Sequence, residues 1–327
     1  MICLGIESTA HTFGIGIVTD DKQVLANERE LFTTEKGGMI PAKVADHHVE
    51  ICDKVIKLAL DKVGLKLSDI DVIAFSQAPG QGHALRVGAF IARYLSLKYK
   101  KPLVGVNHCI AHLEVGNMLT DAKDPLLLYV SGVNTQVIAY DAGKYRIFGE
   151  TLDIGVGNFL DSFARYIGLG FPGGPKVEEM ALNGKNLVDL PYSVKGMDIN
   201  LGGILTNLKQ KFDSGKYTKE DLCYSLQEYV FAMLIETAER ALVHCDKKEL
   251  LLGGGVACNK RLQEMAKLMC EERKAKCYIL PNQFNIDNGA MIAWCGLKMN
   301  KAGISLKLED SRINPYERTD DVNVIWK

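Results

Sequence analysis

The sequence predicts an α/β protein of two similar lobes with a cleft between them, and three observations support this prediction. Strand-like and helix-like patterns alternate along the chain, which is typical of α/β order. The stretches 5–18 and 129–140 repeat one arrangement: an apolar strand, a short turn with hydroxyls and glycine, and a second apolar strand. The length of 327 residues suits two domains of about 150 residues each.

The first lobe is predicted to span 1–122. Its periodic stretches predict helices near 41–63 and 83–99, and its apolar runs predict strands at 2–6, 13–18, 71–76 and 102–106. The last of these strands leads directly into a helix that carries His108 and His112.

A polar break that contains proline, at 120–125, precedes the second lobe, which is predicted to span 123–327. Strand-like runs follow at 126–130, 135–140, 145–150, 249–255 and 277–281, with helices among them. The pattern leaves open whether the last helix stays with this lobe or packs back on the first.

Charge and cysteine usage exclude several classes of protein. Basic residues number 39 and acidic residues 40, so no global basic field attracts nucleic acid or a membrane surface. The nine cysteines are scattered and include no Cys-x-x-Cys pair, which predicts a reducing, cytoplasmic location. We expect neither export nor membrane insertion, because no apolar run reaches the roughly 18 residues that a membrane span needs.

His108 and His112 are candidate metal ligands, because side chains four residues apart lie on one face of a helix. Asp287, before a later apolar helix, is the candidate third ligand, and such a set suits iron, zinc or manganese. The competing interpretations are histidines that pack in the core and an aspartate that caps a helix. Adjacent His47 and His48 are predicted to diverge and not to chelate in this way.

The spacing also resembles the zinc helix of metallopeptidases, but one residue argues against that function. Those enzymes place a glutamate directly after the first histidine, where it acts as general base. Here that position holds Cys109. A peptidase remains the weaker alternative.

Seven ordered motifs resemble, over nearly the whole chain, the universal tRNA threonylcarbamoyl-transferase family, whose archaeal and eukaryotic branch is the catalytic subunit of the KEOPS complex. An older name for such proteins is O-sialoglycoprotein endopeptidase. The motifs are GIESTAHTFGIGIV, KPLVGVNHCIAHL, YVSGVNTQV, DIGVGNFLDSFAR, GFPGGPKVEEMA, LGGGVACN and NIDNGAM.

The resemblance implies an actin-like, sugar-kinase-like and Hsp70-like ATPase fold of two duplicated lobes around a cleft. It also implies transfer of a threonylcarbamoyl group from threonylcarbamoyl-AMP to N6 of adenosine 37 in tRNAs that read ANN codons, with release of AMP. By the family's pattern one metal ion, iron first and zinc or magnesium otherwise, is held by His108, His112, Asp287 and Tyr129.

The resemblance further implies where the adenylate, or ATP, would bind. The residues implied are Tyr129, Val130, Ser131, Gly132, Val133, Asp161, Gly174, Glu178 and Asn259. Considered singly, Asp161 and Glu178 are better explained as helix caps or solvated carboxylates, and Asn259 is equally explained as a helix cap. The chain departs from the family at 200–203, where Asn-Leu-Gly-Gly replaces a Ser-x-Ser-Gly type run. It also carries Glu7 where ATPases of this fold often hold the catalytic aspartate.

The partners that the resemblance implies are tRNA, a Bud32-type kinase or ATPase, a small dimerising subunit and other KEOPS subunits. Two alternatives of different class remain. One is a nucleotide-binding kinase or ATPase of the same fold, and the other is a scaffold that binds nucleotide and subunits without catalysis.

Overall fold

A computed structural model describes residues 1–34 and 40–327, and the chain forms two compact units. The first unit contains Met1–Asp121, Ala142–Tyr145 and Ile286–Lys327; the second contains Ala122–Asp141 and Arg146–Asn285. The division predicted from the sequence, 1–122 and 123–327, differs from this one mainly at the end of the chain. There the last segment returns to the first unit, as the sequence left open.

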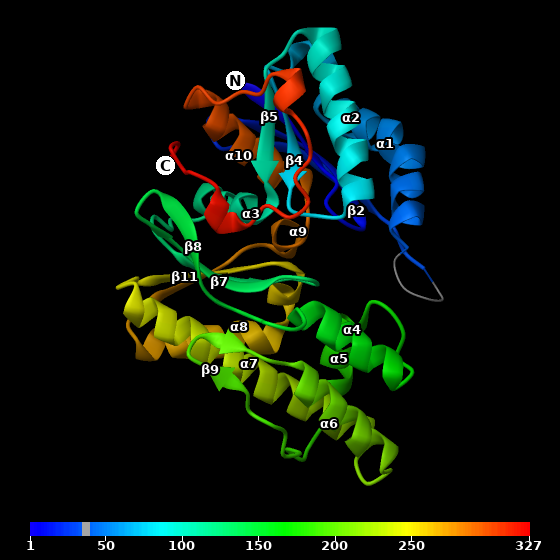
Figure 1. Cartoon of the computed structure of the whole chain (residues 1–327), viewed down its shortest axis with the longest axis vertical. Helices are drawn as coiled ribbons and strands as arrows, with labels where there is room; N and C mark the ends of the chain where they lie inside the picture. The colour runs from blue at the N-terminus through cyan, green and yellow to red at the C-terminus, as the bar shows by residue number, and fades with distance from the viewer. Residues whose placement is uncertain (35–39) are drawn as a thin grey trace. The chain divides into compact units, whose positions relative to one another are not determined.

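The first unit is built on a five-stranded sheet with the order β3-β2-β1-β4-β5 (Figure 1). Strand β1 pairs antiparallel with β2 and parallel with β4. The elements are β1 Ile2–Glu7, β2 Thr12–Thr19, β3 Val24–Leu31, α1 Pro41–Val63, η1 Leu67–Asp69, β4 Val72–Ala78, α2 Gly82–Tyr99, β5 Leu103–Asn107, α3 His108–Leu119, α10 Gly289–Lys301, η3 Leu308–Asp310 and η4 Thr319–Asp321.

The second unit is built on a five-stranded sheet with the order β12-β11-β6-β7-β8. The elements are β6 Leu126–Val130, β7 Thr135–Asp141, β8 Lys144–Glu150, α4 Val156–Tyr166, α5 Gly173–Ala181, β9 Val194–Lys195, β10 Asp198–Ile199, α6 Gly202–Asp213, α7 Lys219–His244, β11 Glu249–Gly253, η2 Gly255–Cys258, α8 Lys260–Glu272, β12 Lys276–Ile279 and α9 Asn282–Asn285. The tip of the β7–β8 hairpin is the short segment that clusters with the first unit.

The two sheets repeat one topology. In each, the first strand in chain order is central, and it pairs antiparallel with the second strand and parallel with the fourth. In the second unit this strand is β6, which pairs antiparallel with β7 and parallel with β11. Helices α1 and α2 connect the third, fourth and fifth strands of the first unit, as α4 to α8 do in the second. The duplication predicted from the paired hairpins is therefore confirmed.

Side chains of β1 alternate between two faces of the first sheet, as the pleat of a strand requires. Leu4 and Ile6 join the apolar core formed with α1 and α2, while Gly5 and Glu7 point to the opposite face. Helix α10 covers that opposite face, and Figure 1 shows the strands between it and α1 and α2. Glu7 is thereby directed into the layer that contains α3 and α10.

Three glycines let the backbone of α10 approach the strands closely. A Cβ atom on Gly5 would lie 2.2 Å from the Ala293 nitrogen, and one on Gly16 would lie 2.1 Å from the Ala290 nitrogen. A Cβ on Gly289 would in turn lie 2.0 Å from the Gly16 nitrogen. Since no side chain fits in these contacts, main-chain packing fixes the position where α10 begins.

The core of the second unit lies between its sheet and the long helix α7. Thr218 caps α7, because its side chain accepts a hydrogen bond from the Asp221 nitrogen at 3.1 Å. Apolar residues of β6, β11, α4, α7 and α8 form one cluster; these include Leu128, Leu252, Phe159, Phe163, Val230, Leu234 and Leu262. In the part of the chain that the structure describes, no helix is both long and apolar enough to cross a membrane.

Replacing Gly16 with Ala should destabilise the protein by about 3 kcal/mol, because the new methyl group collides with backbone that has no freedom to move. We expect the thermal midpoint to fall by about 5 °C or more. Gly203 is the matched control, since its position in α6 has nothing within 4 Å of an added Cβ. Gly203→Ala should leave the midpoint unchanged or raise it slightly. Equal effects of the two substitutions would contradict the proposed role of the close contact.

Candidate functional site

Helix α3 begins at His108 because Asn107 caps it. The Asn107 side-chain oxygen accepts hydrogen bonds from the backbone nitrogens of Cys109 at 3.1 Å and Ile110 at 3.3 Å. The helical spacing then places His108 and His112 on one face, with ring centroids 4.9 Å apart and planes at 80°. Both imidazoles are buried, so the two ring nitrogens meet in a protected site.

Asp287 lies immediately before α10 and faces both imidazoles. Its Oδ1 atom is 3.3 Å from Nε2 of His108 and 3.5 Å from Nε2 of His112. The competing interpretation of Asp287 as a helix cap is wrong, because Asn288 caps α10 by accepting from the Met291 nitrogen at 3.1 Å. All three ligand atoms belong to the first unit and lie within 4.8 Å of one another.

These distances fit a shared cation better than direct hydrogen bonds. A charge-assisted hydrogen bond between imidazolium and carboxylate is about 2.7–2.9 Å long, shorter than either distance here. Two atoms that each bind one ion at about 2.1 Å in tetrahedral geometry lie about 3.4 Å apart. The side chains present therefore suit a first-row metal ion in both chemistry and spacing.

Glu7 orients the first histidine, a role that the sequence did not reveal. The Nδ1 atom of His108 donates to Oε2 of fully buried Glu7 at 3.0 Å, which leaves the Nε2 lone pair directed at Asp287. The other Glu7 oxygen accepts from the Thr9 nitrogen at 2.7 Å and from the Thr9 hydroxyl. One signal for this role was present in the sequence: Glu7 ends an otherwise apolar strand. A carboxylate buried there must accept hydrogen bonds from nearby donors.

The protonation states favour metal binding. Burial lowers the pKa of His112, which favours the neutral imidazole, in which one ring nitrogen keeps its lone pair for a metal. Burial by itself would raise the pKa of Asp287, but the nearby imidazoles of His108 and His112 outweigh burial and hold that pKa well below its usual range. A neutral imidazole and an ionised carboxylate are the forms that bind metals.

Cys109 occupies the position of the peptidase general base and cannot perform that function. Its thiol is 1 % exposed, and burial raises the pKa, so it stays protonated near neutral pH. This argues against peptide hydrolysis by the zinc-peptidase mechanism at the candidate centre.

The expectation that His47 and His48 diverge is wrong. Their Nδ1 atoms are 3.4 Å apart. The His48 side chain points inward, where its Nε2 atom lies 2.9 Å from the Ala10 carbonyl oxygen, and the His47 side chain lies against it. Burial lowers the pKa of His48 to about 4. His48 therefore supports the turn after β1, and its contact with the Ala10 carbonyl explains why this side chain points inward.

The predicted adenylate-binding residues all belong to the second unit, and the structure brings several of them together. The turn of Ser131, Gly132 and Val133 is closed by the Ser131 hydroxyl, which donates to the Asn134 carbonyl at 2.8 Å. The first turn of α4 packs against it, since the nitrogen of Gly157 donates to the Ser131 carbonyl at 3.0 Å. Tyr129 and Val130 lie buried at the end of β6, directly before this turn.

The polar members of the set hold the starts of two helices, α5 and α8. Asp161, on α4, accepts from the Gly173 nitrogen at 2.6 Å, where α5 begins. Glu178, on α5, accepts from the Lys260 nitrogen at 2.8 Å, where α8 begins. Asn259 caps α8 and also donates to Gln227 at 2.7 Å. Gly174 has open space, because an added Cβ would meet only Leu160, at 3.9 Å.

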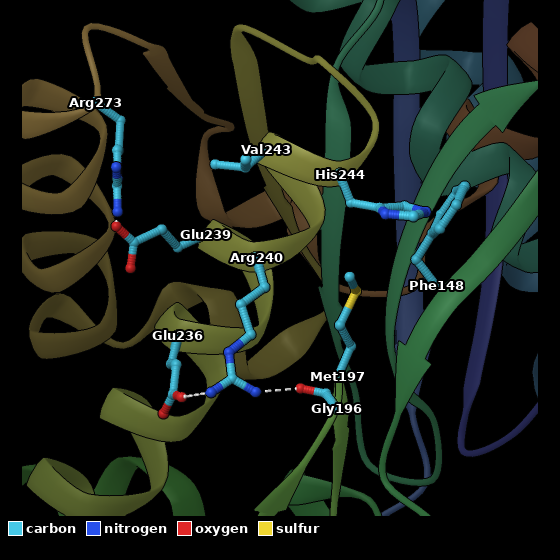
Figure 2. Close-up of a pocket in the computed structure, with 9 residues that line it drawn as sticks. All are labelled: Phe148, Gly196, Met197, Glu236, Glu239, Arg240, Val243, His244 and Arg273. Atoms are coloured by element: carbon cyan, nitrogen blue, oxygen red, sulfur yellow. Dashed lines mark hydrogen bonds and ion pairs between the residues drawn. The ribbon is translucent and has the colours of Figure 1, made fainter.

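A separate surface pocket of about 880 Å³ lies on the second unit (Figure 2). None of the predicted site residues lines it. Its two guanidinium groups are already neutralised, because Arg240 pairs with Glu236 and Arg273 pairs with Glu239. His244 and Phe148 form one wall, with ring centroids 5.8 Å apart.

The duplicated lobes define the class of protein, one of the actin-like ATPase fold that carries a candidate centre of two histidines and one carboxylate. A family model described as TsaD, tRNA N6-adenosine threonylcarbamoyltransferase, matches residues 23–294. The chain belongs to this family of transferases, as its motifs predicted.

Full-length relatives agree with this assignment. A tRNA N6-adenosine threonylcarbamoyltransferase of Thermococcus kodakarensis is 54 % identical over 326 residues, covering 100 % of both chains. A probable bifunctional tRNA threonylcarbamoyladenosine biosynthesis protein of Methanocaldococcus jannaschii is 56 % identical over 326 residues, but the alignment covers only 60 % of that protein.

Solved structures of lower identity share the fold. HypF of Thermococcus kodakarensis superposes with a TM-score of 0.64 at 14 % identity, over 90 % of this chain and 47 % of that one. Component A of (R)-2-hydroxyglutaryl-CoA dehydratase from Acidaminococcus fermentans superposes with a TM-score of 0.58 at 17 % identity, over 92 % and 99 %. The predicted fold class is therefore confirmed.

Replacing Glu7 with Gln should weaken binding of Zn²⁺ by about 10- to 100-fold, because the amide no longer supplies the negative charge that orients His108 and makes it more basic. Competition with a chromophoric chelator measures the dissociation constant. Glu30→Gln is the control, since Glu30 is exposed and also lies on a strand of the first sheet. Unchanged affinity in Glu7→Gln would show that Glu7 does not act on the ligand set.

Proposed function

We propose that the chain transfers a threonylcarbamoyl group from threonylcarbamoyl-AMP to N6 of adenosine 37 in tRNAs that read ANN codons, and releases AMP. The family match over most of the chain and the names of relatives above 50 % identity support the reaction. The single structural observation that carries the proposal is the meeting of His108, His112 and Asp287 at distances suited to one cation.

One metal ion, iron first and zinc or magnesium otherwise, would be held by these three residues, with the Tyr129 hydroxyl as a further ligand. When bound, such an ion supplies Lewis-acid stabilisation of negative charge on a phosphate or carbonyl oxygen. Burial favours the neutral form of His112 by lowering its pKa, and Glu7 holds His108 with its Nε2 atom directed at Asp287. Burial of both imidazoles limits competition from water.

The remaining proposed residues act by placement. The adenylate is a mixed anhydride with a good leaving group, so its carbonyl is already activated, whereas adenine N6 is a weak nucleophile. Holding the two near 3 Å apart is the main contribution that a protein can make. The starts of α5 and α8, which Asp161, Glu178 and Asn259 hold in place, would face the anionic donor, because helix N-termini favour negative charge.

Hydrolysis of ATP by Glu7 is not supported. A catalytic carboxylate at this position of the fold would face magnesium and water, whereas Glu7 is fully buried and both of its oxygens accept hydrogen bonds from Thr9 and His108. A kinase or ATPase activity would need another carboxylate.

The proposed partners are tRNA, a Bud32-type kinase or ATPase, a small dimerising subunit and other KEOPS subunits, in the cytoplasm. A net charge of −1 predicts weak RNA binding by the chain alone, so partners must contribute phosphate contacts. The bifunctional relatives support the association, because their names describe a second function and this chain spans about 60 % of the length of one of them. None of the nine cysteines, all of which the structure describes, forms a disulfide, as suits a reducing compartment.

An apolar stripe on α2 supports docking of a protein subunit. Phe90, Tyr94 and Leu97 follow one another at helical spacing and are 70 %, 52 % and 60 % exposed. Large exposed side chains in one row are typical of interfaces. We assign the stripe to the small dimerising subunit, because a single row of three apolar side chains offers a contact of limited area, as a small partner needs.

Asp287→Ala should reduce tRNA modification at least about 100-fold, because it removes one ligand of the centre, while the thermal midpoint changes little. The assay combines the protein and its partners with unmodified tRNA, threonine, bicarbonate, ATP and the adenylate-forming enzyme. Modified adenosine is then measured by mass spectrometry after digestion of the tRNA.

Asp310→Ala, at an exposed position, is the control for this assay. Full turnover by Asp287→Ala would remove the metal from the mechanism. Phosphorylation of a small substrate, or peptide cleavage that depends on His112, would instead favour one of the competing functions.

Phe90→Asp combined with Leu97→Asp should abolish capture of the small dimerising subunit, because two charges in an apolar contact lack partners. The variant should retain wild-type Zn²⁺ affinity. Leu268→Asp, on α8 of the second unit and 57 % exposed, is the matched control. Undiminished capture by the double variant on a sensor surface would exclude the stripe as the interface.

A further inference from the structure

Helix α3 carries a buried carboxylate on the side away from its metal-ligand face. Glu114 follows His112 by two residues, is 0 % exposed and belongs, like its partners, to the first unit. Its Oε1 atom accepts hydrogen bonds from the Tyr145 hydroxyl at 2.9 Å and the Trp326 indole nitrogen at 3.0 Å. Its Oε2 atom accepts from the Lys298 ammonium at 2.7 Å.

A carboxylate buried in this way is costly unless it is paired, and a more apolar core would be simpler to build. The three donors that satisfy Glu114 are 31, 184 and 212 residues away in sequence. One side chain on α3 therefore joins three distant segments: the tip of the β7–β8 hairpin, helix α10 and the C-terminal segment. The proposed transfer mechanism uses none of these contacts.

The contact with Lys298 connects the two segments that supply the metal ligands. Lys298 lies on α10, which begins two residues after Asp287, and Glu114 lies on the helix of both histidines. Glu114 is about 9 Å along α3 from His108, so a displacement at Glu114 is transmitted by a rigid helix. Because the ligand atoms are only 3.3 and 3.5 Å apart, a small shift of α3 against α10 would open the set.

The C-terminal segment is held beside the same carboxylate. The Val324 nitrogen donates to the Gly143 carbonyl at 2.9 Å, and the Lys327 ammonium lies 5.6 Å from the centre of the Tyr145 ring. Val324 and Trp326 are 3 % and 9 % exposed. The hairpin tip and the C-terminal segment thus pack together, and they bring Tyr145 and Trp326 to the same oxygen of Glu114.

We propose that Glu114 is a positioning residue for the candidate metal centre. It fixes the helix of His108 and His112 against the segment of Asp287 through Lys298, and Trp326 makes this arrangement depend on the C-terminal segment. The inference rests on the proposed function, because it takes the three ligands as a metal centre.

The test measures Co²⁺ affinity and thermal stability separately in metal-free protein. Glu114→Gln preserves shape but removes the charge, and Trp326→Phe keeps an aromatic ring but removes the N–H donor along with part of the indole volume. We expect the Co²⁺ dissociation constant to rise about 10-fold or more in Glu114→Gln and several-fold in Trp326→Phe. The double variant should be less than additive, since both changes act through one contact.

Glu228→Gln is the control for a purely structural loss. Glu228 binds Arg261 through two contacts of 2.6 and 2.8 Å in the second unit, so its replacement should lower the thermal midpoint and leave Co²⁺ affinity unchanged. If Glu114→Gln and Trp326→Phe likewise lower only the midpoint, the positioning role is overturned while the metal centre stands. Failure of the wild-type chain to bind Co²⁺ would overturn the centre itself and the inference with it.

Discussion

The close packing of the start of α10 on the first sheet is the constraint on which the candidate centre depends. Gly16 and Gly289 meet there with no room for a side chain on either, so the main chain determines where α10 begins. Asp287 lies just before that helix, so its carboxylate reaches His108 and His112 from backbone that the packed start of α10 fixes on one side. A ligand delivered by packed backbone has little conformational freedom to lose when it binds an ion.

Two fully buried carboxylates, Glu7 and Glu114, then fix the surroundings of α3 and limit the chemistry available there. Glu7 meets the first histidine of the helix, and Glu114 meets donors on the opposite side. Each is satisfied by several donors, which offsets the cost of removing its charge from water. Because these groups are committed to the architecture of the site, neither is available as a base for peptide or ATP hydrolysis. The groups left for chemistry at this face of the first unit are the three candidate ligands, His108, His112 and Asp287.

Much of the fold and part of the site could be predicted from local patterns. The strands, the long helices and the duplicated hairpins repeat over a few residues each, and the spacing of His108 and His112 is a property of one helix turn. Asp287 belongs to the first unit because of long-range packing, for which the local sequence gives no signal. The predicted boundary at 122 therefore assigned Asp287 to the second lobe. The role of Glu7 depends on which face of β1 it occupies and on a distant imidazole. Asn259 illustrates the remaining ambiguity, since it caps α8 whether or not it also binds a ligand.

Anomalous diffraction at the absorption edge of the bound metal would locate the ion directly in crystals of the purified chain. The geometry predicts one strong peak per chain, about 2.0–2.2 Å from Nε2 of His108, Nε2 of His112 and Oδ1 of Asp287. A peak elsewhere, with these three side chains turned apart, would contradict a metal centre at this position.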